Sequence, residues 1–167
     1  PEPFYSGSLK EAKRFSREYR TLLIREEVTS LETVKDLGTM ELLALRLPQL
    51  TGSPLSLNAL REDLQVNHRT VANWLSIFER LYYIFRLPPF GHPLLRAVKK
   101  EQKHYHLDWT LPANPAIRFE NLVACHLLKW VHYRQDCHGE EYDLRYFRDI
   151  DRREVDFIVT LDGVPKF

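Results

Sequence analysis

The sequence has few cysteines, few glycines and no long apolar run. Its two cysteines among 167 residues are too few for a disulfide framework, which makes a reducing cytoplasm the simplest setting. None of its six glycines falls in the pattern GxxxxGK[ST], so the sequence contains no P-loop for ATP. It shows neither a signal peptide nor an apolar run long enough to cross a bilayer, and we therefore expect no membrane partner.

An excess of charge of one sign is also missing. Lysine and arginine number 24 against 23 aspartates and glutamates, which gives a formal net charge of +1. The chain is therefore no polyelectrolyte, and any nucleic-acid surface must come from local clustering of basic residues. Apolar residues make up 44% of the sequence, which is enough for a sizeable core in one domain or two small ones.

Helical spacing marks the first fifty residues. Ser8 and Glu11 have the spacing of a capping box, and apolar residues follow at helical intervals. A second helical stretch covers about residues 31–47, and the segment TGSP at 51–54 breaks the pattern. We therefore assign residues 1–50 to a helical segment.

The next segment has the pattern of a helix-turn-helix. Ser56 caps a short amphipathic helix, a three-residue connection follows, and Asn67 caps a second helix with a single apolar stripe. The other side of this second helix presents His68, Arg69 and Asn73. Arginine and asparagine suit phosphates and base edges, so we predict DNA contacts for these residues.

Two strand-like runs, at residues 82–87 and 103–107, extend this pattern to a winged helix over residues 51–110. A proline- and glycine-rich turn region lies between them. A protein-contact role fits the same pattern, so DNA and protein partners both stay open. The tip between the strands carries a basic cluster that is able to meet phosphates, made up of Arg96, Lys99, Lys100 and Lys103.

The last third places two acidic residues in apolar surroundings. Asn114 and Pro115 predict the start of a helix that runs to about residue 131, with Glu120 on or beside its apolar face. Two strands follow, and Asp156 lies in the second, within the run RREVDFIV. We expect alternate residues of this strand to share a face and Asp156 to be half-buried. Two carboxylates that converge on one sheet can hold magnesium.

A structural role is the alternative for these two acidic residues. Glu120 would then pair with Arg145 or Arg148, and Asp156 would lie at a sheet edge. The scattered cysteines and histidines form no CxxC or HxxxH pair, so the sequence does not predict a zinc site.

Several segments together resemble one family, the prokaryotic AAA-type ATPases in which a P-loop module is followed by a C-terminal domain of unknown function. The resemblance covers nearly the whole chain. Its most specific parts are FENLVA (residues 119–124) and REVDFIV (153–159), and the remaining parts are residues 1–4, 25–28, 56–64, 68–81, 86–89 and 107–108.

The resemblance implies an α+β protein in three parts: a helical linker (1–50) that follows an absent ATPase module, a winged helix (51–110), and a truncated nuclease-like αββ unit of the PD-(D/E)-x-K type (111–167). Glu120 and Asp156 match the helix glutamate and the second-strand aspartate of that pattern, which in active nucleases hold magnesium. Val164 stands where the acid of Glu-x-Lys belongs, so Lys166 is not assigned a catalytic role. ATP is expected only in the missing N-terminal module.

Three functions follow as hypotheses. The first is a non-catalytic region of a AAA-type ATPase that contacts DNA or a partner protein. The second is a magnesium-dependent nuclease domain, incomplete in this chain, with Glu120 and Asp156 as catalytic residues. The third is a protein-docking module that regulates the ATPase.

Overall fold

The computed structural model describes residues 5, 7–28, 36–91, 102–149, 151 and 153–167. Within them the chain is a mixed α+β protein, as expected. No helix in this described part is both long and apolar enough to cross a membrane. The elements are, in chain order, α2 (Leu9–Leu22), η1 (Leu23–Val28), α4 (Leu37–Arg46), η2 (Leu47–Gln49), α5 (Leu57–Leu64), α6 (His68–Arg80), β1 (Ile84–Leu87), β2 (Lys103–His106), α8 (Pro115–His138), β3 (Tyr142–Arg148), β4 (Glu154–Leu161) and β5 (Val164–Pro165).

Helices α2, α5 and α6 begin where the sequence predicts caps, whereas α4 begins after Asp36, and residues 31–35 of the helical stretch expected at 31–47 lie outside the described residues. Ser8 Oγ accepts a hydrogen bond from Glu11 N at 3.3 Å at the start of α2. Asn67 Oδ1 accepts from Thr70 N at 2.8 Å at the start of α6. Between α5 and α6 the chain turns at Gln65, which has a left-handed φ of 55°. Each cap satisfies backbone donors that the first turn of a helix leaves unpaired, so local side chains set these boundaries.

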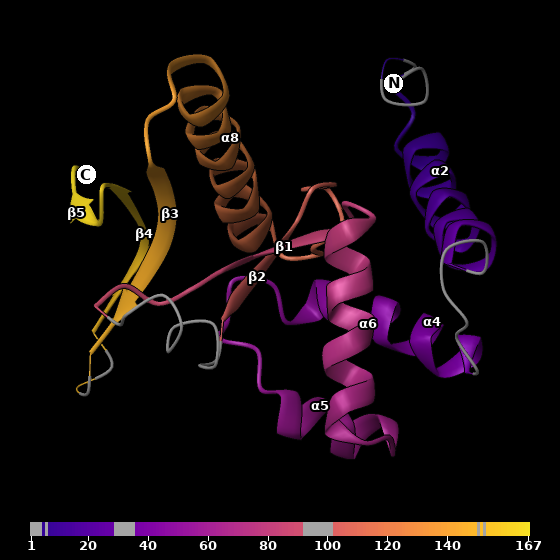
Figure 1. Ribbon diagram of the computed structural model, residues 1–167. Coiled ribbons are helices and arrows are strands. Elements are labelled where there is room, and N and C mark those ends of the chain that lie inside the picture. Colours follow the sequence, from indigo (N-terminus) through magenta and orange to yellow (C-terminus); the bar gives the residue numbers. More distant parts are fainter. Residues whose placement is uncertain (1–4, 6, 29–35, 92–101, 150, 152) are drawn as a thin grey trace.

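The two strands expected after α6 form an antiparallel ribbon. β1 pairs with β2 from Ile84 opposite His106 to Leu87 opposite Lys103. Figure 1 shows this ribbon between the helices α4–α6 and the unit formed by α8 and the sheet β3–β4–β5. Both neighbours cover the ribbon, and all residues of β2 are buried.

Helix α8 begins at the predicted cap but continues well beyond the predicted end. Asn114 Oδ1 accepts from Ala116 N at 2.8 Å, and Pro115 is the first helical residue. The helix ends at His138 rather than near residue 131. The apolar spacing fades in its last turns, but no helix breaker occurs before Gly139, whose φ of 66° ends the helix.

Strand β4 departs from the simple alternation expected for it. Arg145 of β3 pairs with Ile158 of β4, and Phe147 of β3 pairs with Val155 of β4. The two pairs are therefore separated by two residues along β3 but by three residues along β4. β4 therefore carries one extra residue, a bulge that shifts which side chains face the core. As a result Val155 is 49% exposed, although simple alternation would place it on the same face as the buried Val159.

The core consists of two clusters that meet at the ribbon. Helices α4, α5 and α6 surround the first cluster, which includes Tyr83 and Ile84. The second lies between α8 and the β3–β4 sheet and includes Leu87 and Tyr105. Consecutive parts of one ribbon thus belong to both clusters, so the helical body and the C-terminal unit are packed against a common element.

Two neighbouring leucines of α4 test this description of the core. Leu43 is fully buried, and Leu43→Ala is expected to lower the free energy of unfolding by about 2–5 kcal/mol. Leu42 is 57% exposed, and Leu42→Ala is expected to change it by less than about 0.5 kcal/mol. Urea unfolding followed by circular dichroism measures both. Equal losses for the two variants would contradict the placement of α4.

Candidate functional site

Strand β2 presents polar side chains to two different buried surroundings. Because successive side chains of a strand point to opposite faces, Lys103 and Tyr105 share one face and His104 and His106 the other. Lys103 and Tyr105 meet carboxylates of β4 and α8. His104 Nε2 lies 2.9 Å from the carbonyl oxygen of Leu47 on the helical side. The candidate site lies on the first of these faces.

We call Glu120, Glu154 and Asp156, together with the Lys103 and Tyr105 side chains that bind them, the carboxylate cluster. Lys103 Nζ lies 2.8 Å from Asp156 Oδ1 and also contacts Glu154 Oε1. Tyr105 donates its hydroxyl hydrogen to Glu120 Oε1 at 2.7 Å. Residues from β2, α8 and β4 thus converge in one place.

The cluster contains a buried charge that is compensated by its neighbours. The Lys103 side chain is fully buried, whereas that of Asp156 is 53% exposed. Burial lowers the pKa of Lys103, but hydrogen bonds and negative charge from Asp156 and Glu154 outweigh that effect and leave the pKa raised. Lys103 therefore carries its positive charge inside the protein.

Glu120 belongs to the same electrostatic environment. Burial raises the pKa of its carboxyl group, the hydrogen bond from Tyr105 opposes that rise, and the negative charge of Asp156 adds to it. The charge of Asp156 therefore acts on Glu120, and each of the two carboxylates is bound by a different residue of β2. The alternative partners that the sequence offered for Glu120 are engaged elsewhere: Arg145 pairs with Asp143 and Arg148 with Glu154.

This arrangement does not fit a magnesium ion. The Lys103 ammonium lies against the oxygens of Asp156 and Glu154 that a cation would use. In the described ranges, no three or more His, Cys, Asp or Glu side chains are grouped so that they could hold a metal.

Gly52 closes the cluster on the side of the helical body. Its φ of +80° is left-handed, and a Cβ on it would lie 2.7 Å from Glu120 Oε1. Its backbone N–H donates to the carbonyl oxygen of His104 at 3.1 Å. Only glycine allows the backbone to approach both β2 and the Glu120 carboxylate so closely.

Asn121 fixes the end of β2 to α8. Its Oδ1 accepts from His106 N at 2.9 Å, and its Nδ2 donates to His106 O at 2.6 Å, so a fully buried side chain pairs with the strand as another backbone would. Sequence reasoning singled out the FENLVA segment but gave no role to Asn121. The sequence signal that could have identified Asn121 is a polar amide next to Glu120 on the inward side of the helix.

The second helix of the α5–α6 pair has an open polar face. His68, Arg69 and Asn73 are exposed, as the sequence predicted, and Ser76 is exposed beside them, while the opposite side of α6 is buried. Part of this face borders a surface groove lined by Asp36, Gln65, Val66, Asn67, Arg69, Thr70, Ala72, Asn73, Trp74 and Ser76.

The four residues of the basic cluster expected at the ribbon tip have two different outcomes. Arg96, Lys99 and Lys100 lie outside the described residues. Lys103 does not lie on an exposed tip, because its side chain is fully buried and ion-paired. Sequence reasoning placed it with the neighbouring cations, and only the folded structure brings it to Asp156.

These observations define a mixed α+β protein in which a helical body and a helix–sheet unit share a central ribbon. Residues 1–114 match the model of a family described as a domain of unknown function, DUF8612, and the chain belongs to this family. No curated protein and no solved structure matches it. The match ends at the cap of α8, so Gly52 and β2 lie inside the family domain, whereas Glu120 and Asp156 lie beyond it.

The histidines on the second face of β2 make stability depend on pH. Burial lowers the pKa of His104 to about 4 and that of His106 to about 3. An unfolded histidine titrates near pH 6.5, so the unfolded state binds more protons below that value. Stability is therefore expected to fall as the pH drops from about 6.5 toward 4, by at most about 1.4 kcal/mol per pH unit for each histidine.

Urea unfolding between about pH 4.5 and 7.5 measures this slope. His104→Gln should flatten it, because one titrating group is removed. His68→Gln is the matched control, since His68 is exposed at the start of α6 and should leave the slope unchanged. Identical pH profiles for His104→Gln and the parent protein would contradict the prediction.

Proposed function

We propose that this chain is a non-catalytic accessory region that binds duplex DNA through the open face of α6. The observation that carries the proposal is the arrangement of Arg69, Asn73 and Ser76 at positions i, i+4 and i+7 of one helix. Side chains at this spacing line a single face. That face is exposed, while the opposite side of α6 is anchored in the core.

The order of the elements supports a winged-helix reading of this part of the chain. Helix α4 is followed by an isolated β-bridge from Pro54 to Lys103, then by α5 and α6, and then by the ribbon β1–β2. In helix-turn-helix proteins the second helix enters the major groove and the first crosses the backbone. On that geometry α6 is the recognition helix.

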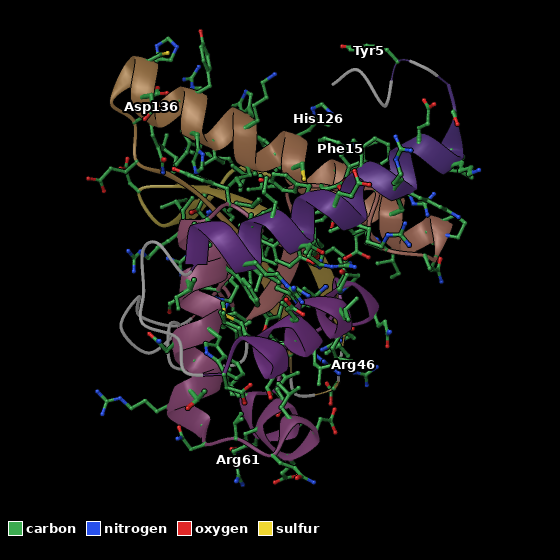
Figure 2. The ribbon with its side chains drawn as sticks, turned by 90° about the vertical axis from the view of Figure 1, so that its right-hand side faces the viewer. Tyr5, Phe15, Arg46, Arg61, His126 and Asp136 are labelled. Carbon is green, nitrogen blue, oxygen red and sulfur yellow. The ribbon has the colours of Figure 1, made fainter. Side chains whose placement is uncertain are left out.

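The charges around α6 favour a nucleic-acid partner more than the sequence alone indicates. Glu79 of α6 is held by Arg86 of β1, with Arg86 Nε 2.8 Å from Glu79 Oε1. Glu62 of α5 lies 3.1 Å from an Arg61 nitrogen. Both carboxylates are thus partly neutralised, and Arg69 has no ion pair within the described residues. Figure 2 shows Arg61 pointing away from the body beside α5, at the end of the molecule opposite Asp136 of α8.

We further propose that this DNA contact serves a AAA-type ATPase. Support comes from the resemblance in FENLVA and REVDFIV, in which such a region follows the ATPase module. A protein-docking role for the same α6 face is the competing proposal. The nuclease hypothesis for Glu120 and Asp156 has less support, because a lysine ammonium lies where a metal would bind.

Fluorescence anisotropy with a labelled duplex tests DNA binding at about 50 and 200 mM salt. Arg69→Ala and Asn73→Ala are each expected to weaken binding by about 1–3 kcal/mol. If Arg69 contacts a phosphate, its replacement should also reduce the salt dependence by about one ion, whereas Asn73→Ala should not.

Lys129→Ala is the matched control, because it removes one exposed positive charge from α8 rather than from α6. It should leave the affinity nearly unchanged. Failure of the parent chain to bind duplex at low salt would overturn the DNA proposal and favour protein docking. Equal losses for Lys129→Ala and Arg69→Ala would indicate non-specific attraction instead of an α6 interface.

A further inference from the structure

Helix α2 carries a row of positive charges on the side that faces solvent. Four cationic residues occupy positions i, i+3, i+4 and i+7, a spacing that places them on one side of a helix. They are Lys10, Lys13, Arg14 and Arg17, and we call them the basic stripe of α2. All four are exposed, and they line a surface hollow together with their neighbours Ser8, Leu9 and Glu11.

The other side of α2 attaches the helix to the rest of the protein. Phe15 and Ser16 are partly buried there, and Phe15 stacks on Tyr19 with 6.2 Å between the ring centres. Ser16 donates its hydroxyl hydrogen to Asp108 Oδ2 at 3.1 Å, shortly after the end of β2. Figure 1 shows α2 at the edge of the molecule, on the side away from the C-terminal sheet. The basic stripe therefore lies on the free side of a helix that the fold holds in place.

The charges of the basic stripe are largely uncompensated. Arg14 lies 3.6 Å from Glu18, but the two side chains are 65% and 66% exposed, so solvent screens the pair. The other three members of the stripe make no ion pair with any residue in the described part of the chain. Glu11 is seven residues before Glu18 and therefore lies on the same flank of the helix, beside the stripe and not within it. An excess of positive charge thus remains on α2, although the whole chain has a formal net charge of only +1.

The composition of the basic stripe favours a phosphate backbone over a protein or a membrane as its partner. Protein interfaces are built around buried aromatic and apolar anchors, and no member of the stripe is one. A helix at a membrane surface inserts its apolar face among the lipids, whereas Phe15, on the aromatic side of α2, is partly buried in the protein. Contacts to phosphates need only positive charges presented in a row.

We propose that the basic stripe of α2 binds the phosphate backbone of duplex DNA, independently of base sequence, as a second contact surface in addition to α6. The stripe rises about 10 Å along the helix axis, and duplex DNA carries about six charges over that length. This inference rests on the proposed function for the identity of the partner, but it concerns a different helix. The stripe then supplies part of the salt dependence of binding, while base contacts belong to α6.

Removal of three charges from the stripe tests this role. The triple variant Lys10→Gln, Lys13→Gln, Arg17→Gln introduces a good helix former at each position. Fluorescence anisotropy with two labelled duplexes of unrelated sequence measures the affinity from about 50 to 200 mM salt. We expect both duplexes to be bound more weakly by the same factor, at least about ten-fold at the lowest salt. The slope of log K against log salt should become shallower by about two to three.

The first control keeps the charges of the stripe. Lys10→Arg, Lys13→Arg and Arg17→Lys together should retain the affinity and the slope of the parent protein, since a phosphate contact requires the charge. Circular dichroism checks that both triple variants keep the helical content of the parent. Equal affinity and equal slope for the glutamine variant and the parent would overturn the proposal.

The second control removes three exposed charges from other parts of the chain, with Arg46→Gln, Lys129→Gln and Lys166→Gln. It should leave the slope nearly unchanged, and a loss equal to that of the stripe variant would overturn the proposal in favour of attraction by net charge alone. Vesicles of phosphatidylserine and phosphatidylcholine are a second probe. Vesicle binding that requires the stripe, with no effect of the stripe on DNA, would assign it to a membrane surface and would also overturn the proposal.

Variants of the two helices separate this proposal from DNA binding by α6. In an Arg69→Ala background the glutamine substitutions should reduce the slope by the same amount, because the two sites share no contacts. If Arg69→Ala has no effect and the stripe variant weakens binding, the α6 interface is wrong and the stripe is supported. The reverse result would overturn the stripe alone, and a parent chain that binds no duplex at low salt would overturn both.

Discussion

The structure depends on one short strand that is buried on both faces and yet consists of polar residues. A buried polar group without a partner is costly, so each residue of KHYH in β2 restricts what can pack against it. Lys103 requires carboxylates, Tyr105 requires an acceptor, and His104 uses the carbonyl oxygen of Leu47. His106 instead stays neutral, with its ring edge-on to Tyr83 at 5.0 Å. The strand therefore specifies the positions of both of its neighbours.

The boundaries that could be predicted from the sequence are those set by local chemistry. The caps at Ser8, Asn67 and Asn114 each involve a side chain and a backbone group within three residues, so short patterns are enough to find them. The end of α8 is predicted too early, because the apolar spacing of the helix fades in its last turns. A helix in contact with the rest of the fold continues through polar turns until a residue such as Gly139 ends it.

The candidate site likewise has a part that could be predicted from local sequence and a part that depends on the folded structure. Glu120 and Asp156 could be found because acidic residues are unusual in apolar segments, a property visible locally. Their partners could not, because Lys103 and Tyr105 reach them only through the pairing of β2 with β1 and its packing on α8 and β4. Lys103 follows other cations in the sequence, which favours a surface position. The bulge in β4 depends on register with β3, and no pattern within β4 alone reveals it.

The ion pairs of Lys103 are better explained by orientation than by net stability. A buried ion pair often contributes little overall, because desolvation of both partners offsets their attraction, and apolar residues of similar size can replace it. Apolar contacts, however, permit many docking angles, whereas an ammonium held by Asp156 and Glu154 permits few. Glu79 and Arg86 fix α6 to β1, β1 pairs with β2, and Lys103 fixes β2 to β4. Contiguous polar contacts therefore hold the exposed face of α6 at a defined angle to α8.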